Sequence, residues 1–346
     1  MNAPHRRPDR PHEDTGPRGR RGAAEPARPD EPRALPLRTV TGSLAPAAVE
    51  GPVLAHEHLA LDLRAGGDER ATLAPERHGR PVAAELDALR GEYGLALVVE
   101  QTCRGMGRDP RALAAIAEEA SVAVIASTGW YYEPFHPPGT AASDPEDLTA
   151  LLLDEIADGL DGTEILPGLL GEVGSHGDSP SPAERRVLTA AAEAALASGL
   201  SVSTHAQLGR GGPAQLEVLT AAGLPPHRVC LGHQDLLDDP GCHRELAAAG
   251  AYVAFDTVGK ENYRPDADRL RLLVALLEAG HADRVLLSCD ISRHGYLRAE
   301  GGQGYGHLFR SFLPRLRAAG ADEDLLDLLT RRNPLRFLTA AVEELP

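Results

Sequence analysis

The sequence predicts an α/β fold, a (β/α)8 TIM barrel that follows a disordered N-terminal tail. Eight short apolar segments recur along the chain, and an amphipathic segment rich in Ala and Leu follows each of them. The short segments are apolar along most of their length, as in parallel strands that are covered on both faces. The chain of 346 residues is long enough for one barrel of this kind. An eight-stranded doubly wound sheet is the alternative that this pattern leaves open.

Residues 1–36 differ in composition from the rest of the chain. They are rich in Pro, Arg, Gly and Asp and contain almost no large apolar side chains. Such a segment buries too little surface to offset the entropy lost on ordering, so we expect a disordered tail. The arginine clusters of this tail are also compatible with binding to nucleic acid or to another anionic partner. Residues 37–346 are expected to form one barrel domain with additional C-terminal helices.

The expected strands and helices alternate along this domain. The strands are expected at 52–58, 95–101, 122–127, 165–172, 200–205, 228–233, 251–256 and 284–290. The helices are expected at 81–92, 110–120, 145–159, 182–198, 213–222, 240–249, 266–279 and 306–319. Residues 322–345 are expected to add one or two more helices.

Several expected helices carry recognisable boundary residues. A cap residue followed by proline is typical of a helix start. Such pairs are Asp109-Pro110, Asp144-Pro145, Ser181-Pro182 and Asp239-Pro240. Glycines are common just past helix ends, where Gly199, Gly223 and Gly250 lie.

Composition limits the class of partner and the compartment. The 35 basic residues are outnumbered by 51 acidic ones, a formal charge of -16, which argues against nucleic acid or an anionic membrane as the main partner. No apolar run is long enough for a transmembrane helix, and no secretory signal is evident. The four cysteines lack CxxC spacing, so we expect reduced thiols in a cytoplasmic protein.

Six residues of metal-ligand type fall at the ends of expected strands. In a TIM barrel, functional groups gather at the carboxyl ends of the strands. His56 and His58 are two residues apart on the first strand, so both should face the barrel interior, about 6–7 Å apart. The full set is His56, His58, Glu172, His205, His233 and Asp290. Together they predict a metal centre.

Each of these residues also has a structural alternative. The two histidines of the first strand are also compatible with ordinary hydrogen-bonded core residues. Glu172 is also compatible with a loop cap or an arginine pair, and Asp290 with a cap of the loop that follows it. A carboxylate at an apolar strand end is costly unless it is paired or bound to a metal, which favours the metal centre.

Five motifs, in this order and spacing, resemble the phosphotriesterase-related branch of the amidohydrolase superfamily. They are LAHEHLALDL, GEVG, STHA, VCLGHQD and LLSCD, and RNPLRFL near the end adds support. The resemblance covers about residues 37–343. It implies a (β/α)8 barrel with two divalent metal ions, zinc being the expected metal. By this similarity His56, His58 and Asp290 hold the buried ion, His205 and His233 hold the exposed ion, and a residue on strand four bridges both.

The lysine content selects a branch of that family. Many members bridge the two ions with a carboxylated lysine, but the only lysine of this chain is Lys260, which follows the seventh expected strand. A lysine bridge from strand four is therefore excluded, and Glu172 is the expected bridge, as in the glutamate-bridged branch.

The implied activity is hydrolysis of an ester, lactone, amide or phosphoester by a bridging hydroxide, with Asp290 accepting the proton. Tyr131 is a candidate for substrate binding, although aromatic packing over the barrel mouth is equally compatible with its position. Lys260 is the other candidate, with a solvated or locally paired lysine as the alternative. Relatives that hydrolyse lactones tend to carry an arginine near the start of the loop after the seventh strand, where this chain has Thr257, which argues against a lactone. The main alternative function is an inactive metal-binding barrel that acts as a binding module. A small molecule is the expected ligand, and a homodimer is the default assembly.

Overall fold

The computed structural model describes residue 1 and residues 36–341 of the chain. The expected disordered tail therefore lies almost wholly outside the described residues, as does the last part of the expected C-terminal helices. None of the helices in the described part of the chain is long and apolar enough to cross a membrane.

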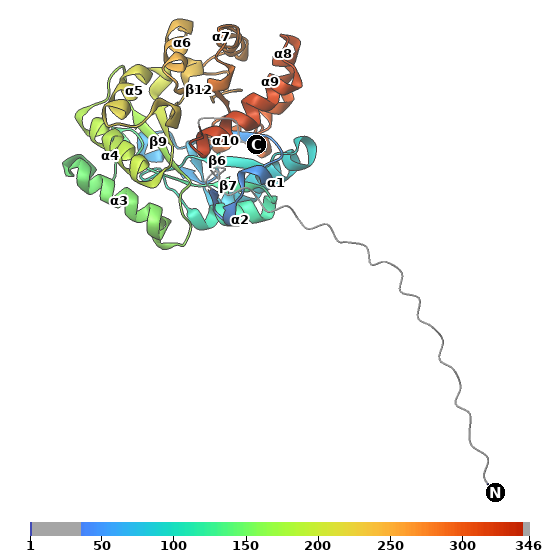
Figure 1. Ribbon diagram of the computed structural model, residues 1–346, viewed down its shortest axis with the longest axis horizontal. Helices are drawn as coiled ribbons and strands as arrows, with labels where there is room; N and C mark the ends of the chain where they lie inside the picture. The colour runs from blue at the N-terminus through green and yellow to red at the C-terminus, as the bar shows by residue number, and fades with distance from the viewer. Residues whose placement is uncertain (2–35, 342–346) are drawn as a thin grey trace. The chain divides into compact units, whose positions relative to one another are not determined.

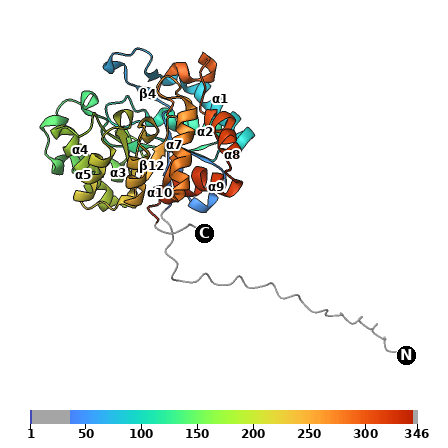
Figure 2. The ribbon, with the colours of Figure 1, turned by 90° about the horizontal axis from the view of Figure 1, so that it is seen from above.

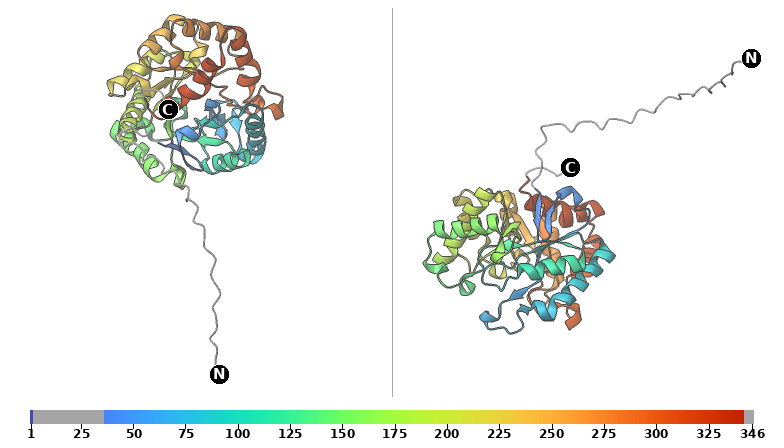
Figure 3. Two further views of the ribbon diagram at one scale, coloured as in Figure 1. Left: turned by 45° about the vertical axis from the view of Figure 1, so that its right-hand side comes forward. Right: turned by 90° about the horizontal axis from the view of Figure 1, so that it is seen from below.

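Parallel strands form a barrel, which confirms the predicted fold class (Figure 3). One run pairs β3 (Val53–Glu57), β6 (Leu97–Glu100) and β7 (Ala123–Ile125). The other run pairs β8 (Ser127–Thr128), β9 (Leu169–Ser175), β10 (Val202–Ala206), β11 (Val229–Leu231), β12 (Tyr252–Phe255) and β13 (Val285–Leu287). β7 and β8 are two parts of the expected third strand. The backbone N–H of Asp290 donates to the carbonyl of His56 at 3.2 Å, which joins the last strand to the first.

Helices surround the barrel (Figures 1 and 3). They are α1 (Pro75–Tyr93), α2 (Pro110–Ala120), α3 (Pro145–Asp158), α4 (Pro182–Ser198), α5 (Gly212–Ala221), α6 (Pro240–Ala248), α7 (Asp266–Glu278), α8 (Leu313–Ala318), α9 (Glu323–Asp327) and α10 (Asn333–Leu338). Two π-helical turns, Leu308–Phe312 and Leu328–Arg332, precede α8 and α10. Two short hairpins pair β1 (Leu37–Thr39) with β2 (Gly42–Leu44) and β4 (Leu61–Asp62) with β5 (Thr72–Leu73).

The helix starts follow the expected capping chemistry at three of four positions. The side chains of Asp109 and Asp239 accept backbone N–H groups of the first turn, and Ser181 forms a capping box with Glu184. Asp144 precedes α3 but makes no side-chain cap. α1 begins at Pro75, six residues before the expected start, and contains Pro81. The expected start took Pro81 as the first helical residue, whereas Pro75 occupies that position.

Two apolar layers fix the strands. Residues that alternate along the strands, such as Val53, Leu97 and Tyr252, pack inside the barrel against α10. The intervening residues, such as Val98 and Val253, pack outward in the cluster that includes the surrounding helices. Both faces of the sheet are thus covered, which explains why the strands read as continuous apolar runs.

Candidate metal centre

Glu172 lies at the centre of four histidines at the carboxyl ends of the strands. Its carboxylate oxygens are 3.6 Å from His56 Nε2, 3.3 Å from His58 Nε2, 3.1 Å from His205 Nδ1 and 3.5 Å from His233 Nε2. Glu172 is 1% exposed. The strand-end prediction thus brings together five residues from four different strand ends.

Asp290, the sixth predicted ligand, lies beside His58. Its Oδ1 is 3.2 Å from His58 Nε2. The ammonium of Lys260 contacts the other carboxylate oxygen and lies 3.0 Å from Ser292 Oγ. Asp290 therefore faces the histidine cluster with one oxygen and a buried cation with the other.

Local backbone irregularities aim these side chains into the barrel. Val53 and Ala55 belong to the inner apolar layer, so strict alternation would place His56 on the outer face. The register between β3 and β6 shifts between Leu54 and Glu57, and this bulge turns His56 and His58 inward.

His233 and Asp290 have left-handed backbones, with φ of 58° and 49°. Such conformations are uncommon outside glycine and concentrate at functional sites. Both residues lie just after strands that end at Leu231 and Leu287, earlier than the sequence suggests. The ends of two expected strands are therefore turns that present ligand-type side chains.

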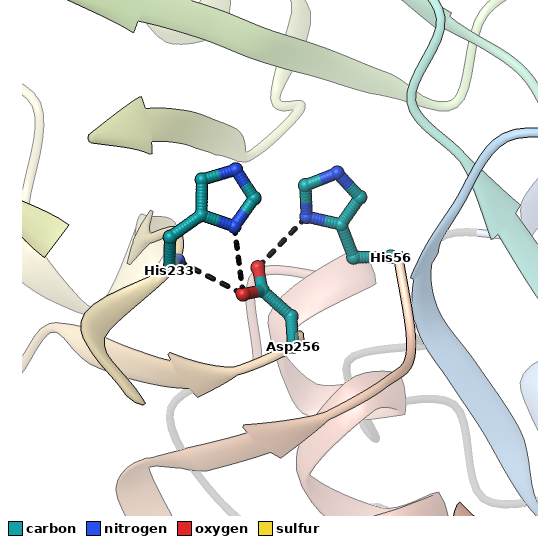
Figure 4. A group of neighbouring side chains, drawn as sticks. All are labelled: His56, His233 and Asp256. Carbon is teal, nitrogen blue, oxygen red and sulfur yellow. Dashed lines mark hydrogen bonds and ion pairs between the residues drawn. The ribbon is translucent and has the colours of Figure 1, made fainter. Parts of the chain in front are cut away.

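Asp256 orients two of the four histidines (Figure 4). His56 Nδ1 lies 2.8 Å from one of its oxygens, and His233 Nδ1 lies 2.9 Å from the other. An ionised carboxylate only accepts hydrogen bonds, so both Nδ1 atoms carry the proton. The Nε2 atoms of His56 and His233 consequently face Glu172. Each carries a lone pair when its ring is neutral and a proton when its ring is cationic.

His58 is oriented by a relay from a different strand. Its Nδ1 lies 2.9 Å from Thr102 Oγ1, and that hydroxyl donates to Glu100. Because the hydroxyl proton goes to Glu100, the oxygen accepts from His58 Nδ1–H. Its Nε2 therefore points at Glu172 and Asp290 and carries a proton only when the ring is cationic.

His205 is bound in the opposite sense. Its Nε2 donates to Gln207 Oε1 at 2.7 Å, which leaves Nδ1 facing Glu172. That Nδ1 lies only 2.9 Å from His233 Nε2. Two imidazole lone pairs at this distance repel each other unless a proton or a metal ion is shared between them.

This donor set fits divalent metal ions. The inner ring nitrogens of the four histidines converge on one carboxylate, and the outer nitrogen of each ring has a hydrogen-bond partner. The inner nitrogen of His56, Nε2, is buried without a hydrogen-bond partner. Ligand atoms of His56, His58 and Glu172 lie within 4.8 Å of one another, as do those of Glu172, His205 and His233. Imidazole and carboxylate are the ligands that zinc and related ions prefer. Glu172 belongs to both groups, as a bridge requires.

The pKa values show that the site attracts positive charge. Burial opposes ionisation of His58, but Asp290 and Glu172 outweigh burial and raise its pKa to about 9. Burial likewise opposes ionisation of His233, and Asp256 reverses this and raises the pKa to about 10. Burial alone would raise the pKa of Glu172, whereas His56 and His205 hold it well below its usual range.

Metal binding is expected to release protons at neutral pH. His58 and His233 have pKa values of about 9 and 10, so both inner nitrogens are protonated at pH 7 when no metal is bound. A metal ion displaces these protons, and its affinity should therefore rise with pH across the neutral range. Calorimetric titration of metal-free protein with Zn²⁺ in buffers of different ionisation enthalpy measures the number released. A heat independent of the buffer would contradict this prediction.

The centre opens into a cavity of about 190 Å³. Tyr131 and Lys260, the predicted substrate-binding residues, both line it, as does Arg293. The Tyr131 hydroxyl is 3.4 Å from His205 Nε2, and its ring packs edge-on against that imidazole at 4.5 Å. Aromatic and cationic side chains thus line the cavity together with the residues of the candidate metal centre.

Sequence reasoning missed the residues that orient the ligands. Asp256 ends the expected seventh strand, so the rule that found the histidines could have found it too. Glu57 lies between the two histidines of the first strand and accepts hydrogen bonds from Ser288 Oγ and the N–H groups of Cys289 and Ile291. Burial raises the pKa of Glu57 to about 7. These contacts fix the turn that carries Asp290, and no local pattern indicates them.

Residues 36–338 match the model of the Phosphotriesterase family. The chain belongs to the phosphotriesterase family. This membership confirms the resemblance, and it places the chain in the amidohydrolase superfamily. The family assignment covers nearly all of the described residues.

Three relatives illustrate the range of this family. The phosphotriesterase homology protein of Escherichia coli is 37% identical over 287 residues, which cover 83% of this chain and 97% of the relative. The N-acetyltaurine hydrolase of Rattus norvegicus is 35% identical over 273 residues, which cover 74% and 78%. The organophosphorus hydrolase structure from Deinococcus radiodurans is 30% identical, with a TM-score of 0.78 and coverage of 89% and 98%.

The crystal structure of the E. coli relative superposes closely on the present fold. Its TM-score is 0.81 at 36% identity, and the match covers 84% of this chain and 99% of that chain. The structure is described as complexed with phosphate in its active site. The names of these relatives thus include hydrolysis of N-acetyltaurine and hydrolysis of organophosphorus compounds.

Proposed function

We propose that this protein is a metal-dependent hydrolase of small molecules that holds two divalent metal ions, with zinc as the expected metal. The observation that carries the proposal is the convergence of four oriented imidazoles on Glu172. The family membership and the hydrolase names of the relatives support it.

We assign His56, His58 and Asp290 to one ion, His205 and His233 to the second, and Glu172 to both. The contacts of Glu172 with all four histidines support its role as the bridge. Asp256 then acts from outside the ligand set, because its oxygens face the outer nitrogens of His56 and His233.

When bound, such ions supply Lewis acidity, which polarises a carbonyl or phosphoryl group and lowers the pKa of coordinated water. Asp290 is the proposed general base, because its carboxylate borders both His58 and the cavity. Burial would raise its pKa, but Lys260 and His58 hold the pKa below its usual range. Asp290 is therefore ionised and ready to accept a proton at neutral pH. Tyr131 lines the same cavity and is proposed to contact the substrate beside His205.

Two cations line the cavity, and each is also paired with a carboxylate, Lys260 with Asp290 and Arg293 with Asp68. Lys260 is 4% exposed and lines the cavity together with Arg293. The guanidinium of Arg293 is held by Asp68 and by the Tyr263 hydroxyl, which lies 3.1 Å away. We propose an N-acyl amide that carries a sulfonate or carboxylate, in agreement with the N-acetyltaurine hydrolase relatives. Lactones, carboxylic esters and phosphoesters are the alternatives.

A hydrolysis screen of zinc-loaded protein tests this proposal. The panel contains N-acetyltaurine, N-acetyl amino acids, neutral N-acyl amides, lactones and phosphotriesters. We expect the highest kcat/KM for an anionic N-acyl amide and loss of activity after chelation. If zinc-loaded protein hydrolyses nothing in the panel, the inactive binding barrel becomes the better hypothesis.

Replacing Lys260 with methionine is expected to change the pH profile of the reaction. Lys260 stabilises the ionised form of Asp290, so its loss raises the pKa of that carboxyl group. As the pH is lowered, kcat/KM of the variant should therefore fall earlier than that of the wild type, since more of Asp290 is then protonated. An unchanged acid limb together with a higher KM for anionic substrates would indicate that Lys260 only contacts the substrate.

The remaining proposals concern location and assembly. A cytoplasmic location is supported by four free cysteines, of which Cys103, Cys230 and Cys289 are buried. A homodimer stays a prediction.

A further inference from the structure

A second cluster of ligand-type side chains lies away from the metal centre described above. It joins His78 on α1 to His294 and Glu300, which lie in the two short 3-10 helices after β13, His294–Tyr296 and Arg298–Glu300. One ligand atom from each of the three residues lies within 4.8 Å of the other two. The segment after β13 lies against α1, as Figure 2 shows.

The histidines of this cluster have unsatisfied polar atoms. His78 is 3% exposed, and neither of its ring nitrogens has a hydrogen-bond partner. Nδ1 of His294 is likewise buried without a partner. A neutral buried imidazole has one N–H donor and one acceptor, and leaving either without a partner is unfavourable because the group has lost its hydrogen bonds to water. His78 and His294, two such groups, lie against each other, which points to a ligand between them.

Binding of a single ion requires one of the two rings to turn. The rings of His78 and His294 are stacked, with an angle of 1° between their planes and centroids 5.5 Å apart. Because a metal ion lies in the plane of each imidazole that binds it, the half-buried His294 must turn until its ring nitrogen points toward the ion. Tetrahedral zinc with Zn–N bonds of about 2.0–2.1 Å requires ligand atoms roughly 3.4 Å apart, so three atoms that lie within 4.8 Å of one another must also come closer together. Glu300 has room for this movement because its carboxylate is exposed and its contact with Arg77 is long, at 3.7 Å.

We propose that His78, His294 and Glu300 form a third divalent metal site, selective for ions that favour imidazole, such as Zn²⁺, Ni²⁺ or Cu²⁺. An ion bound at this site links the segment after β13 to α1, because His78 lies on α1 and the other two ligands lie in that segment. His294 directly follows Ser292 and Arg293, which line the cavity of the proposed active site. Glu85 of α1 already accepts the N–H groups of Arg298 and Tyr305, so the ion adds a second attachment nearer to the cavity.

Metal counting on the full chain tests the proposal. Wild-type protein and the variants His294→Ala and Glu300→Gln are equilibrated with Zn²⁺, freed of excess metal and measured by elemental analysis. We expect one zinc fewer per chain in His294→Ala, and at least about tenfold weaker binding of that ion in Glu300→Gln. His227→Ala, which changes a histidine remote in sequence from the cluster, should match the wild type.

The comparison does not depend on the proposed function. All four proteins share the central histidines and Glu172, so the difference of one ion is expected whether the central site binds two ions or none. Equal zinc content in wild type and His294→Ala would overturn the proposal and indicate that water fills the gap.

Hydrogen exchange gives a second readout that does not rely on stoichiometry. Zn²⁺ should slow amide exchange in residues 292–300 of the wild type and have no such effect in His294→Ala. Equal zinc-dependent protection in both proteins would show that the effect arises at the central site and would also overturn the proposal.

Discussion

Replacing Glu172 with alanine is expected to remove at least one metal ion per chain and to lower kcat/KM by at least about 100-fold. The carboxylate contacts all four central histidines and belongs to both groups of candidate ligands. Without this carboxylate, the four imidazoles supply only neutral ligand atoms around the centre of the site. The site then has less negative charge to stabilise two divalent cations, so its affinity for metal should fall. Elemental analysis of zinc-loaded protein measures the ions retained, and the substrate identified by the screen measures activity.

Glu217→Ala provides the matched control, because this glutamate lies exposed on α5. The control should retain its full zinc content and activity. Glu172→Ala protein that keeps two central ions would refute the bridge, even if its activity were low. In that case the loss of activity would have to arise from the altered charge of the cavity.

The candidate ligand set could be proposed from the sequence because it follows from local rules. Strand ends of a parallel barrel meet at one edge, and residues two apart on a strand share a face, which places His56 and His58 on the same side. The fold class follows for a similar reason, since apolar runs alternate with amphipathic segments. The absence of any lysine other than Lys260 was enough to select Glu172 as the candidate bridge.

The supporting groups depend on contacts that no local pattern encodes. Glu57 holds the turn at Asp290 through residues more than 230 positions away in sequence. The bulge that turns His56 inward is a property of the pairing between β3 and β6. The cluster of His78 with His294 likewise arises only when the segment after β13 folds onto α1. No rule applied to the sequence alone places these two histidines together.

Replacing Asp290 with asparagine is expected to lower kcat by about 10²–10⁴-fold, the range typical of a lost general base, while most of the metal is retained. The amide has nearly the shape of the carboxylate, so the turn held by Glu57 should persist. What disappears is the charge that accepts a proton beside His58 and that pairs with Lys260. The measurements are steady-state kinetics and zinc content on the same preparation.

The pH profile separates a lost base from a lost ligand. Asparagine does not titrate, so the acid limb of kcat/KM that Asp290 produces should vanish in the variant. In Lys260→Met the same limb is retained and moves upward, so the pair of variants assigns it to one carboxyl group. Asp283→Asn, a partly exposed aspartate before β13, is the control and should leave rate and profile unchanged. Full activity in Asp290→Asn would exclude this residue as the base, and loss of an ion together with the rate would show that its main role is to hold metal.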